Sequence, residues 1–138
     1  MPLHLEVITP EGKTFEEDVD MVIAPGSEGY LGILPHHMPL LTALGPGEFR
    51  VKEGGTERTL AVFGGFMDVR PDRVVVLTDA AERAEDIDVE RAHQARERAQ
   101  QALSAAAMDP AEEARARAAL QRALVRIRVG ERRPRRGT

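Results

Sequence analysis

Hydrophobic and polar residues alternate along most of the first 84 positions of the chain, as at Leu3, His4 and Leu5. Alternation with a period of two is the pattern of a β-strand with one buried face. Turn-forming sequences separate the alternating segments; they include TPEG at 9–12, EGGTE at 53–57 and PDR at 71–73. Short strands joined by such turns predict an antiparallel β-sandwich or barrel over residues 1–84.

A different pattern begins at Asp86. From there to Met108 the chain has no glycine or proline and is rich in alanine, arginine, glutamate and glutamine, all of which favour helix. Asp86 and Asp88 are candidate N-caps, because a carboxylate there accepts hydrogen bonds from the free N–H groups of the first turn. These features predict a first long helix.

A second helix is predicted from Pro110 to Gly130, with Asp109 as its N-cap. The residues expected in the contact between the helices are mostly alanines: Ala92, Ala95, Ala99, Ala102, Ala116, Ala119 and Ala123, with Leu103, Leu120, Leu124 and Ile127 as larger anchors. Alanine allows a close approach but buries little apolar area. Because burial contributes only ~25 cal/mol per Å², these contacts stabilise the hairpin weakly. We therefore expect a weakly held antiparallel hairpin over residues 85–130, followed by a disordered basic tail over residues 131–138.

Charge is distributed unevenly along the chain. Residues 1–84 hold seven Lys and Arg against 14 Asp and Glu, whereas residues 111–138 hold nine Arg against three Glu. An acidic body with a basic end favours docking of the chain on itself or on an acidic partner. The chain has no cysteine, no secretory signal pattern and no apolar run near the ~20 residues of a membrane span. We expect a soluble protein without disulfides.

The segment GYLGILPHHMPLLTAL at 29–44 interrupts the alternation with glycines, prolines and two adjacent histidines. Neighbouring side chains of an extended segment point to opposite faces, so His36 and His37 are poorly placed to chelate one metal ion. No serine or acidic residue forms a catalytic arrangement with them, and the glycines lack the Lys-Ser/Thr of a phosphate-binding loop. We interpret the segment as a shaped surface, with neither a metal nor a catalytic site, whose apolar side chains face partly a core and partly a partner.

Four arginines form the clearest constellation of charge. Arg91 and Arg98 are two helical turns apart, and Arg122 and Arg126 are one turn apart, so each pair shares a helix face. If these faces adjoin in the hairpin, four guanidinium groups converge on a polyanion. Spacing alone favours a solvated arginine face instead. Nucleic-acid binding by the basic end is disfavoured, because aromatic stacking residues are absent there and the body is acidic.

Three features cover nearly the whole chain in one order: the segment at 29–44, FGGFMDVRPDRVVVLTDAAERAEDID at 63–88, and the Ala/Arg-rich helical end. In these motifs the chain resembles the epsilon subunits of bacterial F-type rotary ATP synthases. The resemblance implies a ten-stranded antiparallel β-sandwich followed by a two-helix antiparallel hairpin. It also implies a rotor subunit without catalytic residues of its own. The competing interpretations are a free-standing nucleic-acid-binding module and an independent enzyme, for which the sequence has no catalytic constellation.

The resemblance further implies partners and a location. The β-sandwich would bind the gamma subunit and the ring of membrane c subunits at the foot of the central stalk. The hairpin would inhibit ATP hydrolysis by extending toward the catalytic alpha and beta subunits. The chain would lie at the cytoplasmic face of the bacterial cell membrane, attached only through the complex. The expected docking residues are Leu31, Leu34, His36, His37 and Met38.

Some bacterial members of this family bind ATP in the folded hairpin through an Ile/Leu-Asp-x-x-Arg-Ala motif, which this chain contains as IDVERA at 87–92. The resemblance carries a nucleotide-binding role onto eight residues: Glu82, Ile87, Asp88, Arg91, Ala92, Arg98, Arg122 and Arg126. It implies that no cofactor is required and that ATP is a regulatory ligand, which holds the hairpin closed when ATP is abundant.

Overall fold

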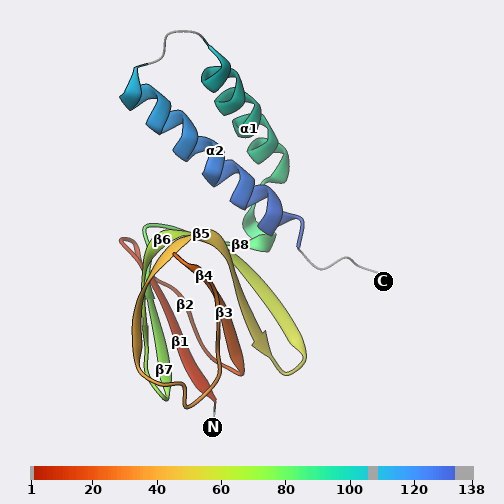
Figure 1. Cartoon of the computed structure of the whole chain (residues 1–138). Coiled ribbons are helices and arrows are strands. Elements are labelled where there is room, and N and C mark those ends of the chain that lie inside the picture. The colour runs from red at the N-terminus through yellow and green to blue at the C-terminus, as the bar shows by residue number, and fades with distance from the viewer. Residues whose placement is uncertain (1, 106–108, 133–138) are drawn as a thin grey trace, which may run out of the picture. The chain divides into compact units, whose positions relative to one another are not determined.

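The computed structural model describes residues 2–105 and 109–132 (Figure 1). The chain divides into two compact units, one ending at Arg83 and the other beginning at Ala84. We refer to them as the β unit and the helical unit. The predicted basic tail beyond Arg132 lies outside the described residues.

The β unit contains eight strands. They are β1 (Leu3–Thr9), β2 (Gly12–Val19), β3 (Met21–Gly26), β4 (Gly29–Ile33), β5 (Leu40–Glu53), β6 (Thr56–Val69), β7 (Arg73–Leu77) and β8 (Ala81–Arg83). In β1 every second residue is buried, from Leu3 to Thr9. The predicted period-two alternation is therefore confirmed in this strand.

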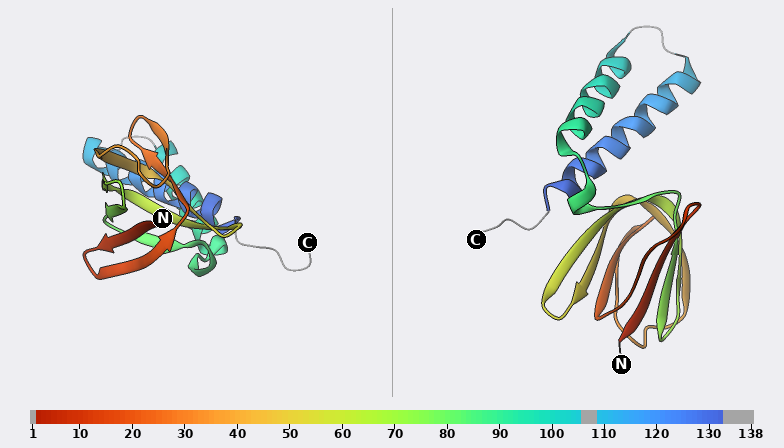
Figure 2. Two further views of the ribbon diagram at one scale, coloured as in Figure 1. Left: turned by 90° about the horizontal axis from the view of Figure 1, so that it is seen from below. Right: turned by 180° about the vertical axis from the view of Figure 1, so that it is seen from behind.

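Two long strands, β5 and β6, organise the sandwich. Their pairing is interrupted between Leu44 opposite Gly65 and Pro46 opposite Phe63. Gly64 and Gly65 have positive φ angles there, of 90° and 111°, which glycine adopts without steric cost. On one side of this bend β6 continues the sheet through β7, β1 and β2, and on the other side the two strands pair with β8 and β3, followed by β4. Each long strand thus belongs to both layers, and the strands enclose a common interior (Figure 2).

The predicted β-sandwich is present, but it has eight strands where ten were expected. The difference arises because β5 and β6 each contribute to both five-stranded layers as continuous strands. The expectation of a wholly antiparallel sheet is wrong at one pair, since β1 and β7 run parallel with Leu5 opposite Val74. A parallel pair requires a long crossover connection, which the strands between β1 and β7 provide.

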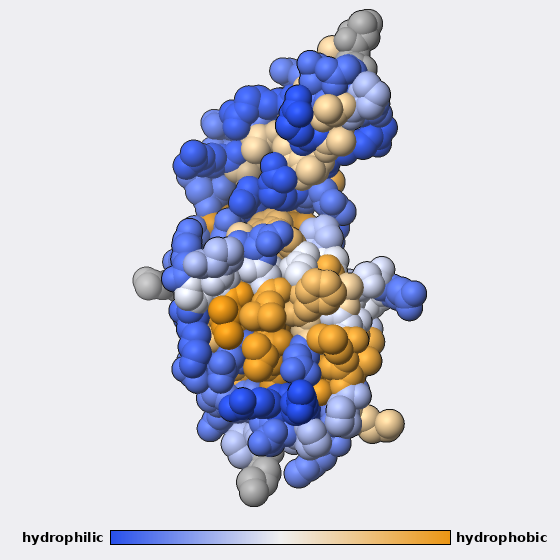
Figure 3. All heavy atoms as spheres, turned by 90° about the vertical axis from the view of Figure 1, so that its left-hand side faces the viewer, coloured by the Kyte–Doolittle hydropathy of each residue, from blue (hydrophilic) through white to orange (hydrophobic). Residues whose placement is uncertain are grey.

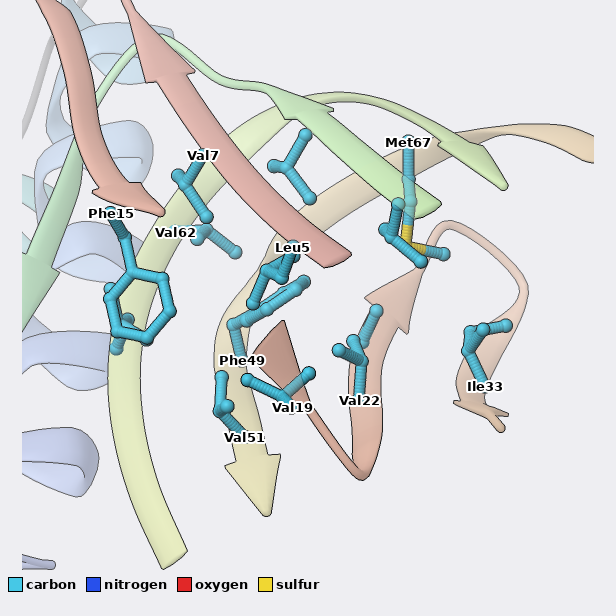
Figure 4. Packing of buried hydrophobic residues seen from close by; sticks show 14 of the residues in the cluster. Leu5, Val7, Phe15, Val19, Val22, Ile33, Phe49, Val51, Val62 and Met67 are labelled. Carbon is cyan, nitrogen blue, oxygen red and sulfur yellow. The ribbon is translucent and has the colours of Figure 1, made fainter. Parts of the chain in front are cut away.

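The two faces of the folded sheet differ in character. The outer face carries charged groups and a cluster of hydrophobic side chains (Figure 3). The inner face forms the core, in which aliphatic and aromatic side chains from both layers interlock (Figure 4). The side chains of the core that are 2% exposed or less include Leu3, Leu5, Val7, Val22, Ile33, Phe49, Val51, Leu60, Val62, Met67 and Val69.

The helical unit contains a short 3₁₀ helix, η1 (Ala84–Asp86), followed by α1 (Val89–Ser104) and α2 (Pro110–Gly130). Asp88 caps α1, since its carboxylate accepts a hydrogen bond from Arg91 N at 3.1 Å. Asp86 does not cap it, because this residue belongs to η1, and α1 begins later than predicted. Residues 106–108 of the predicted first helix lie outside the described residues.

The second helix begins and ends as predicted. The Asp109 carboxylate accepts a hydrogen bond from Glu112 N at 2.8 Å, and Pro110 occupies the first turn. Neither described helix is apolar enough over sufficient length to cross a membrane.

The contact between the helices is built largely from small residues. Ala92, Ala99 and Ala123 are buried, together with Ile127. The other four predicted alanines, as well as Leu103 and Leu120, are half-buried. Leu124 was expected as an anchor but is 41% exposed, because it lies about 100° around the helix from Ala123. The contact surface between the two helices, which we call the seam, therefore contains few large side chains.

Candidate functional site

The loop between β4 and β5 is fixed to the turn between β6 and β7. His36 has a left-handed backbone with φ of 68°, and its N–H donates a hydrogen bond to Pro71 O at 2.7 Å. The two sequence motifs at 29–44 and 63–88 therefore meet at one end of the sandwich. This contact gives the loop a defined shape, as expected of a docking surface.

The five predicted docking residues differ in exposure. Met38 is 78% exposed and Leu34 is 55% exposed. His36 is exposed, whereas Leu31 and His37 are half-buried, and Leu31 packs against the core. Leu34, His36 and Met38 are therefore the members of the set that are most available to a partner.

An exposed apolar area that the sequence did not predict lies on the outer face of β5, β6 and β7. Phe66 pairs with Leu77 on one side and Ala43 on the other, so these side chains form one row across the sheet. Leu41, Phe66 and Leu77 are 71%, 56% and 52% exposed, and Ile8 joins Phe66 and Leu77 around a shallow hollow. We call Ile8, Leu41, Phe66 and Leu77 the apolar outer face (Figure 3).

The signal for this face was present in the alternation. Met67 and Val69 occupy the inward phase of β6 and are fully buried, so Phe66 must point outward. A large hydrophobic residue in the outward phase of a strand is unexplained by the strand's own core. Such a residue marks a candidate interaction surface.

Charged groups occupy the outer face over β1 and β2. His4 lies opposite Asp18, and Glu6 lies opposite Glu16. His4 Nδ1 is 2.8 Å from Asp18 Oδ1, and His4 Nε2 is 3.0 Å from Glu16 Oε2; these two carboxylates raise the pKa of His4 above its ordinary value.

Among the described residues, His4, Glu6 and Glu16 form the one group of three possible metal ligands. The Lys13 ammonium already lies within 3.7 Å of both glutamates. The cluster is thus a network of ion pairs on the outer face. Neither His36 nor His37 belongs to such a group, and His37 Nδ1 instead lies 2.8 Å from Met38 O.

The IDVERA segment combines buried residues, a capping residue and an exposed arginine. Ile87 and Ala92 are buried, and Asp88 caps α1. Arg91 is exposed. The motif therefore fixes the start of α1 and presents one guanidinium group to solvent.

Each of the four predicted arginines directly precedes a buried residue of the seam. The four pairs are Arg91–Ala92, Arg98–Ala99, Arg122–Ala123 and Arg126–Ile127. A helix turns by about 100° per residue, and in two antiparallel helices that face each other, positions one residue before the seam lie on the same side of the pair. We call these four residues the arginine face.

The arginines also match in height along the hairpin. Gly130 of α2 lies against Ile87 and Val89, which brings the end of α2 level with the start of α1. With a rise of about 1.5 Å per residue, Arg126 and Arg91 are then close to one level, and Arg122 and Arg98 follow at about 12 and 15 Å from that end. Such a double pair of cations suits an extended polyanion.

The surroundings of these arginines differ. Arg91, Arg98 and Arg122 are exposed, and within residues 2–105 and 109–132 their guanidinium groups form no ion pair. Arg126 is half-buried. Glu82, the eighth predicted nucleotide-binding residue, lies half-buried on β8 of the β unit, opposite Ala61.

The chain matches known families over both units. Residues 2–84 match the family described as ATP synthase, Delta/Epsilon chain, beta-sandwich domain, and residues 85–131 match ATP synthase, Delta/Epsilon chain, long alpha-helix domain. The sandwich and the paired helices thus define a two-domain chain of the delta/epsilon type.

Curated relatives match at nearly full length. The ATP synthase epsilon chain of Dehalococcoides mccartyi is 50% identical over 131 residues, which cover 95% of this chain and 94% of that one. The epsilon chain of Syntrophobacter fumaroxidans is 51% identical over 129 residues, covering 94% and 96%. The chain belongs to the ATP synthase epsilon chain family, whose members are non-catalytic subunits of that complex.

Solved structures share the fold. A chain of the Euglena gracilis mitochondrial ATP synthase, in a structure of its OSCP/F1/c-ring, superposes with a TM-score of 0.80 at 25% identity, covering 89% of this chain and 78% of that one. A chain in a structure of the Tetrahymena thermophila mitochondrial central stalk and c-ring gives a TM-score of 0.60 at 14% identity, covering 94% and 97%. At 14% identity the second likeness concerns the fold alone.

Proposed function

We propose that this chain is a rotor subunit of the central stalk of an F-type ATP synthase. Its β unit docks on the gamma subunit and the c-ring, and its hairpin regulates ATP hydrolysis in response to ATP. The subunit then works at the cytoplasmic face of the bacterial cell membrane, held there by the complex. Membership of the epsilon chain family supports this assignment.

The apolar outer face is the observation that carries the docking role. Three large side chains that are more than half exposed lie on adjoining strands of a rigid sheet. Apolar groups gathered on a sheet of fixed shape are what a stable protein partner buries, and aromatic residues commonly dominate the binding energy. Phe66 is the aromatic residue at the centre of this row.

Affinity for a purified gamma subunit tests the docking role. The variants Phe66→Ser and Leu77→Ser should each weaken binding by about 2 kcal/mol. Leu124→Ser is the matched control, since it removes an exposed leucine from the helical unit. Unchanged affinity in both β-unit variants would place the gamma contact elsewhere on the chain.

The arginine face supports the role of ATP. Four guanidinium groups on one side of a closed hairpin suit a triphosphate, and opening the hairpin separates Arg91 and Arg98 from Arg122 and Arg126. A ligand that binds only the closed form stabilises it by RT ln(1 + [L]/Kd), about 2.7 kcal/mol at a hundredfold excess over Kd. For a seam made mostly of alanine, this stabilisation is enough to decide whether the closed or the open conformation of the hairpin predominates.

Calorimetric titration of the full chain with ATP, with and without magnesium, tests the nucleotide site. Arg91→Ala and Arg126→Ala should weaken binding at least tenfold. Arg117→Ala is the control, because Arg117 belongs to the same hairpin but pairs with Glu113 at 2.7 Å, away from the arginine face. Equal affinities for all three variants would refute the site.

The regulatory role predicts an effect on the assembled enzyme. When ATP is scarce, the released hairpin would extend toward the alpha and beta subunits, where the arginines of α2 would pair with carboxylates. In a reconstituted complex, Arg91→Ala should then inhibit hydrolysis at ATP concentrations that relieve inhibition by the wild-type chain. An identical dependence on ATP in both complexes would argue against nucleotide control.

A further inference from the structure

Gly130, the last residue of α2, is buried against the segment that starts α1. A β-carbon at position 130 would lie 2.5 Å from Val89 Cγ2 and 3.2 Å from Ile87 Cγ2. Carbon atoms in contact are normally about 3.5–4.0 Å apart. Valine and isoleucine are branched at Cβ and have few alternative rotamers, so neither side chain can easily withdraw.

Two ordinary reasons for glycine at this position do not apply. Glycine often follows a helix because it adopts a left-handed backbone, but Gly130 is helical and is not among the glycines with positive φ. Helix propensity also favours alanine over glycine. A buried glycine in helical conformation at this position therefore indicates that the close approach itself is required.

The approach involves the residues on either side of the α1 cap. Ile87 and Val89 flank Asp88, whose carboxylate holds Arg91 N at 3.1 Å. Arg91 and Arg126 are the two members of the arginine face nearest this end of the hairpin. The spacing between α1 and α2 at Gly130 therefore bears on the distance between the backbone positions that carry these two arginines.

We propose that Gly130 is the positioning residue of the closed hairpin: it alone lets the end of α2 seat on Ile87 and Val89, and this seating sets the distance across the arginine face. The consequence for nucleotide affinity rests on the proposed function, whereas the seating itself does not. A side chain at position 130 wedges this end open, so the substitution shifts the hairpin toward its open form without removing any charge.

The test uses three variants of the full chain: Gly130→Ala, Val89→Ala and the double variant. Because the chain has no cysteine, Gln94→Cys and Gln121→Cys on exposed helix positions allow specific spin labelling and a distance measurement across the hairpin. Circular dichroism checks that every variant keeps its helix content. ATP affinity is measured by calorimetry on the unlabelled chains.

Gly130→Ala should lengthen or broaden the label distance and weaken ATP binding about tenfold, in line with the cost of overpacking a buried site. Val89→Ala removes the methyl groups that oppose position 130 and should relieve the overpacking. The double variant should therefore bind ATP more tightly than Gly130→Ala alone. Helix propensity alone predicts that Gly130→Ala stabilises the hairpin, and that adding Val89→Ala does not improve ATP binding.

An unchanged label distance in Gly130→Ala, or a double variant no better than the single one, would overturn the proposal. A wild-type chain that binds no ATP would refute the nucleotide part of the proposed function. The label distances would in that case still decide whether Gly130 seats the hairpin.

Discussion

The β unit and the helical unit differ in the side chains that stabilise each of them internally. The core of the β unit contains Phe49, Leu5 and Met67 with no exposed surface, drawn from both layers of the sandwich. The seam of the hairpin is formed mainly by alanines such as Ala92 and Ala123. Since hydrophobic stabilisation scales with buried apolar area, at ~25 cal/mol per Å², contacts within the hairpin contribute far less per residue.

This difference fits the two roles that we propose for the units. A rigid sheet keeps the apolar outer face and the loop at His36 in one shape, as a docking surface requires. A hairpin whose helices bury little apolar area opens with a small change in free energy. The binding free energy of a ligand can therefore control its conformation. Four sets of substitutions, taken from the largest expected effect to the smallest, test this comparison.

The close approach at Gly65 should be the least tolerant position of the β unit. A β-carbon there would lie 1.9 Å from Leu77 O, and φ is +111°. Because the obstacle is backbone in a paired strand, Gly65→Ala should cost about 4 kcal/mol or more. Gly64→Ala is the control, with φ of +90° but its nearest atom, Leu44 O, at 3.8 Å. If urea unfolding gave equal losses of stability for the two variants, the positive φ angle, and not the close approach to Leu77 O, would be the main cause of the destabilisation.

Large-to-small substitution should separate the two units directly. Phe49→Ala should destabilise the β unit by about 3–5 kcal/mol, and Ile127→Ala should destabilise the hairpin by about 2 kcal/mol. Hydrogen exchange resolved along the chain reports where each loss occurs. We expect Ile127→Ala to accelerate exchange in α1 and α2 only; faster exchange throughout β1 to β7 would contradict the independence of the units.

The N-cap of α2 should contribute a smaller amount. Asp109→Ala removes the hydrogen bond to Glu112 N and should cost about 1 kcal/mol of hairpin stability. Asp86→Ala is the matched control, an exposed aspartate that caps neither α-helix. Thermal unfolding followed by far-UV circular dichroism checks the pair. A larger loss of stability in Asp86→Ala than in Asp109→Ala would reverse the assignment of the caps.

The charged cluster at His4 should give the smallest effect, visible only as pH dependence. Asp18 and Glu16 raise the pKa of His4, so its contribution to stability is fully present below the unfolded-state pKa of about 6.5. That contribution is lost as the pH rises through the higher folded-state pKa. The stability difference between wild type and His4→Gln should therefore shrink from pH 6 to pH 9. A difference independent of pH would show that His4 acts only through packing.

Much of this architecture was predictable because it follows from local patterns. The alternation at Leu3, Leu5 and Val7 predicted a strand, and Asp109 with Pro110 predicted the start of α2. The count of strands was not predictable, because a bent strand such as β6 joins two layers through glycines whose role emerges only from the pairing. The cap of α1 was predicted only as one of two aspartates.

The candidate sites show the same limit. Arg91, Arg98, Arg122 and Arg126 could be grouped by helical spacing, but their common side of the hairpin depends on which residues form the seam. The outward phase of Phe66 could be read from its alternation with Met67 and Val69, but Leu77 ends an unbroken apolar run and looks like a core residue. Only the pairing of β6 with β7 places the two side chains next to each other. Long-range pairing, which local patterns do not encode, supplies this information.

Hydrogen exchange of the full chain with and without saturating ATP tests the central claim most directly. We predict that ATP slows exchange across α1 and α2, through stabilisation of the closed hairpin, and leaves the core strands β1, β5 and β6 unchanged. Arg91→Ala should abolish this protection. Equal exchange with and without ATP, or protection confined to the β unit, would contradict the account of a rigid docking unit joined to a hairpin held closed by nucleotide.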